Sequence, residues 1–129
     1  KAKPGGCVGN VCIYHATTAC DVTNIVKRLV PNGVDAALLL HTLYWLLDPV
    51  KELSCIVSAL SPSGKLIIGQ QVVESTPGLV AMVAAMGAKH VLSWKGVEKM
   101  LAASGYELEK RYLRYMPYYV AIWKPRRGS

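Results

Sequence analysis

The segment VDAALLLHTLYWLLDPVKELSCIVSALSPSGKLIIG, residues 34–69, decides the fold. Its first part, Val34–Leu40, is a nearly continuous apolar run, which predicts a strand buried on both faces, as in a parallel sheet. Asp48 and Pro49 then predict the start of a helix, because Asp is a favoured N-cap and Pro is tolerated at the first helical position. A second strand should follow at Lys65–Gly69. Strand, helix and strand at this spacing indicate a β-α-β unit.

Downstream of this unit the chain first continues the alternation of strands and helices and then ends in two consecutive strands. A helix is expected over Leu79–Ala88, lying over the sheet, and another from the N-cap Ser93 to a stop at Gly105. Tyr106–Tyr115 and Tyr118–Trp123 then predict two antiparallel strands. The fold class is therefore α/β, a three-layer Rossmann-like fold with helices on both faces of a reduced parallel sheet and an antiparallel terminal hairpin.

The N-terminal third gives weaker signals. Residues 1–10 are expected to be an irregular lead-in, and Val11–Tyr14 a short strand. Asp21 and Thr23 are both candidate N-caps for a helix that follows. Residues 126–129 form a basic tail, and the whole chain should be one domain.

Composition excludes several classes of protein. The chain has 129 residues, of which 52% are hydrophobic and 18% charged, so wholesale disorder is excluded. No run approaches the ~18 consecutive apolar residues of a membrane span, and the N-terminus lacks the apolar region of a signal peptide. We therefore expect a cytoplasmic protein that makes no contact with membranes.

The order and spacing of several segments resemble those of the class I S-adenosylmethionine-dependent methyltransferases. Val34–His41 resembles the fourth strand of that family, and Leu46–Pro49 resembles the start of its next helix. Ala59–Ile68 looks like the turn into its fifth strand. Ser93–Glu107 looks like its last helix and sixth strand, and Tyr119–Trp123 matches the seventh, antiparallel strand. The resemblance covers about residues 34–125.

The resemblance implies S-adenosylmethionine as cofactor and a ligand site at the carboxyl ends of the strands. It implies three cofactor-binding residues, which are Asp21, His41 and Thr42. In the alternative reading Asp21 only caps a helix.

Trp45, Gln70 and Gln71 are the implied substrate-binding residues, because they also follow strands at this end. Glu74 is the nearest carboxylate that could take a proton from a methyl acceptor. The catalytic residues and the acceptor stay unassigned.

One feature departs from that family. Its members bind the cofactor with a glycine-rich loop after the first strand. Here Gly5, Gly6 and Gly9 precede the first strand candidate, and the segment His15–Cys20 after it contains no glycine. Two explanations stay open. The chain is the C-terminal portion of a longer enzyme, or it is a shortened domain in which strand 11–14 lies directly beside Val34–Leu40 in a five-stranded sheet.

Two functions follow from these two explanations. The first is a methyltransferase, and the alternative is a non-catalytic methyltransferase-like scaffold that acts through protein contacts. A protein partner or a homo-oligomer is expected in either case, because a reduced sheet exposes an edge.

The net charge is +7, and the excess of basic residues is concentrated near the C-terminus. Arg111 and Arg114 stand there among tyrosines, so nucleic acid is a further partner to test.

The cysteines and methionines are candidates for core, disulfide or metal-binding roles. Cys55 is expected in the core, whereas Cys7, Cys12 and Cys20 are close enough in sequence for a disulfide. Their spacing does not match a zinc site, so no metal is expected. Met82 and Met86 are interpreted as core filling.

Overall fold

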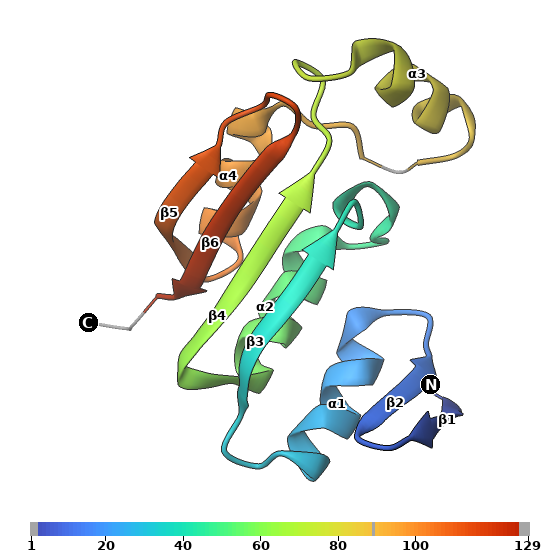
Figure 1. The fold of residues 1–129 in the computed structure, drawn as a ribbon, viewed down its shortest axis with the longest axis vertical. Coiled ribbons are helices and arrows are strands. Elements are labelled where there is room, and N and C mark those ends of the chain that lie inside the picture. Colours follow the sequence, from blue (N-terminus) through green and yellow to red (C-terminus); the bar gives the residue numbers. More distant parts are fainter. Residues whose placement is uncertain (1–2, 89, 127–129) are drawn as a thin grey trace.

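The computed structural model describes residues 3–88 and 90–126, and its main sheet has four strands in the order β3-β4-β6-β5 (Figure 1). These strands are β3 (Val34–Leu40), β4 (Leu60–Gln70), β5 (Tyr106–Leu113) and β6 (Tyr119–Pro125). β3 pairs with β4 in parallel, whereas β6 pairs with both β4 and β5 in antiparallel fashion. The predicted α/β fold class, with a reduced parallel sheet and an antiparallel terminal hairpin, is confirmed.

The helices are α1 (Ala19–Leu29), the short 3-10 helix η1 (Leu43–Trp45), α2 (Pro49–Ala59), α3 (Pro77–Ala85) and α4 (Trp94–Ala103). Two predicted caps are confirmed, because Asp48 and Ser93 accept hydrogen bonds from backbone amides in the first turns of α2 and α4. The predicted caps of α1 are wrong. Thr18 caps that helix, accepting from the amide of Asp21 at 3.4 Å.

Helices α1, α2 and α4 form one layer, because α1 packs on α2 and α2 on α4 (Figure 1). The helices expected on the second face of the sheet are not found among residues 3–88 and 90–126. The reason lies in the direction of the chain. The connections from β3 to β4 and from β4 to β5 both move across the sheet in the same direction, and right-handed crossovers then place their helices on the same side.

The prediction that β3 is buried on both faces is wrong. β3 is the edge strand of the sheet. Ala37 and Leu39 point to the helical layer, where they line a cavity with α1 and α2. Leu38 and Leu40 point to the opposite face and are 58% and 55% exposed. We call this side, with Leu38 and Leu40, the open face.

The N-terminal residues form a separate two-stranded hairpin of β1 (Lys3–Val8) and β2 (Val11–His15). An irregular lead-in was therefore the wrong expectation for residues 3–8. The hairpin strands pair with each other and belong to a different sheet from β3. This overturns the five-stranded arrangement in which strand 11–14 pairs with Val34–Leu40. Residues 127–129 of the basic tail lie outside the described residues.

The core lies between the sheet and helices α2 and α4. Its largest fully buried side chains include Leu43 of η1, Leu53 of α2, Leu66 of β4, Leu101 of α4, Tyr106 of β5 and Tyr119 of β6. The Tyr106 hydroxyl donates to the carbonyl oxygen of Leu53 at 2.7 Å, which ties β5 to α2. No helix formed by the described residues is both long enough and apolar enough to cross a membrane.

Candidate functional site

The carboxyl ends of β3 and β4 lie side by side and are joined by hydrogen bonds. The parallel register brings Leu40 opposite Gly69. The next residue, His41, donates its backbone N–H to the carbonyl oxygen of Gly69 at 2.7 Å. Its ring Nδ1 in turn accepts the backbone N–H of Gln71 at 3.2 Å. Two predicted residues, His41 and Gln71, are thus in direct contact at the end of the sheet where open α/β folds bind ligands.

His41 has an unusual backbone. Its φ is 53°, the only positive φ of a non-glycine residue among those described. Such a conformation costs on the order of 1 kcal/mol or more for an L-residue, and it is often found where a side chain is held for function. The His41 side chain is exposed, and its ring meets the ring of Tyr118 edge-on with centroids 5.9 Å apart. The sequence gives no sign of either feature.

Gln70 is buried directly next to Gln71 and holds nearby backbone groups in place. It is only 1% exposed, and its Oε1 accepts the backbone N–H of Leu43 at 3.2 Å. Its Nε2 donates to the carbonyl oxygen of Gln71, also at 3.2 Å. Both polar atoms of this side chain are therefore engaged inside the protein, and Gln70 positions η1 and the end of β4.

Thr42 directly precedes η1, and Trp45 is the last residue of η1. The Thr42 hydroxyl donates to the carbonyl oxygen of Leu40 at 3.0 Å. Trp45 is 46% exposed, so its indole ring is open to solvent rather than part of the core. Aromatic faces of this kind stack readily on flat ligands.

Asp21 lies on a different element, in the first turn of α1. It lines a cavity of about 250 Å³ together with Thr18, Asp48, Lys51 and other residues at the start of α2. Thr18 rather than Asp21 caps the helix, so the capping explanation for Asp21 is wrong. Its implied role toward a cofactor stays a prediction.

Glu74 has a structural partner at the far side of the site. Its Oε1 accepts the backbone N–H of Trp94 at 3.2 Å, and its charge adds to burial in raising the pKa of Tyr44. Helix α3 follows Glu74 and lies beyond the end of β4 rather than over the sheet (Figure 1). The core-filling interpretation of its methionines is wrong, because Met82 and Met86 are 54% and 70% exposed.

The glycines do not form a loop that could hold the methionine part of a cofactor. Gly6 and Gly9 have positive φ values of 110° and 62°, and both belong to the N-terminal hairpin. Residues 16–20, which follow β2, contain no glycine. The described residues therefore fit one wall of an S-adenosylmethionine site, made of imidazole, hydroxyl and aromatic groups, and do not supply its glycine-rich wall. No group of three or more metal-binding side chains occurs among them either.

The basic terminal hairpin is largely engaged within the protein. Arg111 makes two hydrogen bonds of 2.7 Å to the Glu98 carboxylate, and the Tyr119 hydroxyl donates to the same carboxylate at 2.9 Å. The Arg111 and Arg114 guanidinium groups also lie 4.9 and 5.2 Å from the centre of the Trp94 ring. Burial acts to raise the pKa of Glu98, but the bonds from Arg111 and Tyr119 outweigh it and lower that pKa.

This chain is similar to known proteins in its fold but not detectably in its sequence. No family model matches the sequence, and no curated protein matches it significantly. A solved protein from Sulfolobus solfataricus, assigned to the type 11 methyltransferases, superposes with a TM-score of 0.56 at 19% identity, over 82% of this chain and 66% of that one. The mitomycin 7-O-methyltransferase MmcR superposes with a TM-score of 0.55 at 21% identity, over 80% of this chain and 32% of that one.

The fold is one that solved methyltransferases share. LepI, solved in complex with SAM, shares it with a TM-score of 0.56 at 18% identity, over 74% of this chain. The chain spans 27% of the length of LepI. The shared fold confirms the fold that the sequence resemblance implies. His41, Thr42, Gln70 and Gln71 lie at the carboxyl ends of β3 and β4, where open α/β sheets in general bind ligands.

Proposed function

We propose that this chain is the acceptor-side part of an S-adenosylmethionine-dependent methyltransferase. The observation that supports this proposal is the contact between His41 and Gln71 across the ends of two adjacent parallel strands. In open α/β sheets, ligands bind beyond these ends. The strained backbone of His41 keeps its imidazole exposed there, beside Tyr118. Nothing in the comparisons favours the scaffold alternative.

The roles of the site residues follow from their exposure and contacts. His41 and Thr42 would contact the cofactor from the end of β3, and Trp45 and Gln71 would contact the acceptor. Asp21, on α1, would contact the adenine end of the cofactor. Gln70 is a positioning residue, because its own polar atoms are used to hold Leu43 and Gln71.

The bound cofactor would supply an electrophilic methyl group on its sulfonium. Methyl transfer then needs alignment of the acceptor and, for a protonated acceptor, a base. In His41 the Nδ1 atom already accepts the Gln71 amide, so Nε2 carries the proton in the neutral ring and can donate to a ligand. The part of the site that this chain supplies should bind the cofactor weakly by itself, and a glycine-rich wall from another segment or another chain would strengthen that binding.

Calorimetric titration of the chain with S-adenosylmethionine tests this proposal. We expect saturable heat for the wild type and at least a tenfold weaker affinity for His41→Ala. His15→Ala is a matched control on the N-terminal hairpin and should bind as the wild type does. Absence of heat at millimolar cofactor, or equal losses in both variants, would overturn the proposal.

A further inference from the structure

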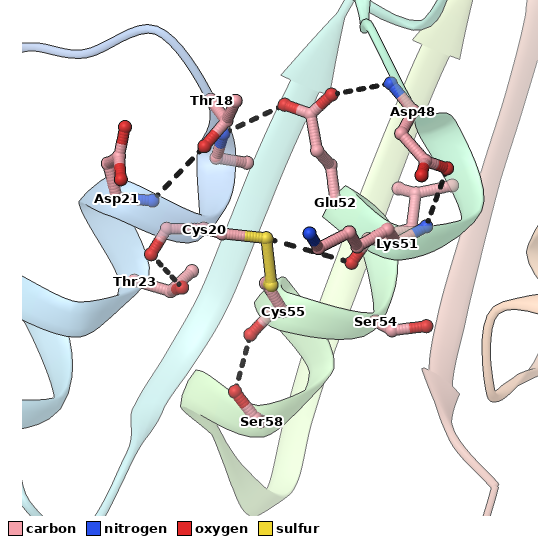
Figure 2. The surroundings of a disulfide bond; sticks show 12 residues. Thr18, Cys20, Asp21, Thr23, Asp48, Lys51, Glu52, Ser54, Cys55 and Ser58 are labelled. Atoms are coloured by element: carbon pink, nitrogen blue, oxygen red, sulfur yellow. Dashed lines mark hydrogen bonds between the residues drawn. A yellow bond between two sulfur atoms is a disulfide. The ribbon is translucent and has the colours of Figure 1, made fainter. Parts of the chain in front are cut away.

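A disulfide joins the first two helices of the chain. Cys20, in the first turn of α1, is bonded to Cys55, in the middle of α2, across 35 residues of sequence (Figure 2). The expectation that Cys55 is a core residue is wrong, because it is half-buried and bonded. Both cysteines are only partly buried.

Packing beneath α1 is loose. Thr23 is the only buried residue of the helix. An apolar cavity of about 330 Å³ lies between α1, β3 and α2, lined by Val22, Val26, Leu39 and Ile56 among others. Well-packed interfaces contain few voids larger than a water molecule, so this cavity makes the packing of α1 against β3 looser than that of the core.

Polar contacts hold only the start of α1. The buried Glu52 carboxylate accepts the backbone N–H of Ala19 at 2.9 Å and that of Asp48 at 3.0 Å, as Figure 2 shows. This carboxylate links the first turn of α1 to the first turn of α2. A single hydrogen bond of this kind stabilises less than the loss of conformational entropy that ordering an eleven-residue helix requires.

We propose that Cys20–Cys55 is a redox-operated latch that holds α1 over the apolar cavity. A dithiol reductant would open it. The first thiolate attacks one sulfur and forms a mixed disulfide, and the second thiol displaces it. Two electrons and two protons pass to the protein, leaving two cysteine thiols, and the reductant becomes a cyclic disulfide. Release of α1 would expose the apolar surfaces of β3 and α2 that it covers, while α2, α4 and the four-stranded sheet stay folded.

The second disulfide provides the matched control. Cys7 and Cys12 are only five residues apart and face each other as direct partners in the β1–β2 hairpin. Reducing this bond leaves both residues in a short hairpin and frees no helix from the main sheet. The two disulfides of one chain therefore predict different responses to the same reductant.

Hydrogen–deuterium exchange with mass spectrometry tests the latch. The full chain is compared with and without dithiothreitol, alongside the variants Cys20→Ser with Cys55→Ser and Cys7→Ser with Cys12→Ser. In the wild type, dithiothreitol should speed exchange of the α1 amides at least tenfold and leave α2, β4 and α4 protected. The Cys20/Cys55 variant should show the fast α1 exchange without reductant, and the Cys7/Cys12 variant should respond as the wild type does.

Four results would overturn the proposal. The first is protein purified without reductant in which alkylation and peptide mapping find free thiols at Cys20 and Cys55. The second is α1 exchange that reduction does not change. The third is faster exchange of α2, β4 and α4 together with α1, and the fourth is loss of the α1 response in the Cys7/Cys12 variant. The third result would mean that the Cys20–Cys55 bond stabilises the whole domain and not α1 alone. Reoxidation of the wild type should restore slow exchange of α1.

Discussion

The backbone amide of Gln71 donates a hydrogen bond of 3.2 Å to Nδ1 of His41, and this bond links the ends of β3 and β4. It fixes the ring of a residue whose backbone is in the left-handed region, with φ of 53°. The position therefore carries conformational strain and also presents an exposed imidazole. Two substitutions separate these properties.

Replacement of His41 by Gly and by Ala should give different stabilities. Glycine adopts positive φ without a steric cost, whereas alanine keeps the strain and loses the ring contacts. We expect His41→Gly to be more stable than His41→Ala by about 1 kcal/mol, measured by urea denaturation. Both variants should lose affinity for S-adenosylmethionine equally. If the alanine variant were the more stable one, the strain at this position would be disproved.

Acid should destabilise the protein through Glu98. Its pKa in the folded state lies below the usual value of 4.5, because the hydrogen bonds from Arg111 and Tyr119 outweigh the effect of burial. A carboxyl with a lower pKa in the folded state stabilises the fold above its unfolded pKa, and this stabilisation is lost as pH falls through the folded pKa.

We therefore expect the free energy of unfolding to decrease as the pH falls below about 4.5, and more steeply in the wild type than in Glu98→Gln. Urea denaturation at a series of pH values measures this difference. Glu107→Gln is the matched control, since Glu107 forms an exposed ion pair with Lys124. Parallel pH profiles for the wild type and Glu98→Gln would show that the Arg111–Glu98–Tyr119 contacts do not stabilise the fold.

The free edge of β3 should drive self-association. Leu38 and Leu40 are more than half exposed on the open face, and the edge carries no lysine or proline to block pairing. We expect light scattering at micromolar concentration to show a dimer in which β3 pairs with β3 of a second copy. Leu38→Lys should give a monomer, whereas Val8→Lys, on the exposed hairpin, should not. A monomeric wild type would refute this prediction.

The terminal arginines should not form a nucleic-acid site. Arg111 is bound to Glu98, and Arg126 donates to the carbonyl oxygens of Ala102 and Tyr106, both at 3.0 Å. In fluorescence anisotropy with a single-stranded oligonucleotide at two salt concentrations, Arg111→Ala with Arg114→Ala should weaken binding no more than Lys65→Ala with Lys95→Ala. A selective loss, with a log–log salt slope flatter by about 1.5, would identify the hairpin as a binding site.

The sequence predicted those elements whose signals are local. Asp48 with Pro49, and Ser93, carry their capping chemistry in the residue itself, so the starts of α2 and α4 were predicted correctly. The start of α1 was missed, because Thr18, Asp21 and Thr23 are all residue types that cap helices, and residue type alone does not decide among them. The apolar run Val34–Leu40 identified a strand, but an edge strand and a central strand have the same composition.

The site was predicted by position and not by geometry. Placing His41 and Gln71 after neighbouring strands followed from the β-α-β pattern, and the structure brings them into contact. The left-handed backbone of His41 has no signature in its residue type, and its ring contact joins it to Tyr118, 77 positions further along the chain, which no local pattern predicts. The pairing of Cys20 with Cys55 was missed for the same reason, because cysteine spacing does not determine connectivity.

Amide NMR spectra of the 15N-labelled chain, titrated with S-adenosylmethionine, test the central claim most directly. Ligand at the ends of β3 and β4 should shift the amides of Leu43 and Gln71, whose hydrogen bonds run to Gln70 and His41. The amides of the β1–β2 hairpin, with Cys7 and Cys12, should not move. Shifts confined to that hairpin, or no shifts at millimolar cofactor, would contradict a cofactor site at the carboxyl ends of these strands.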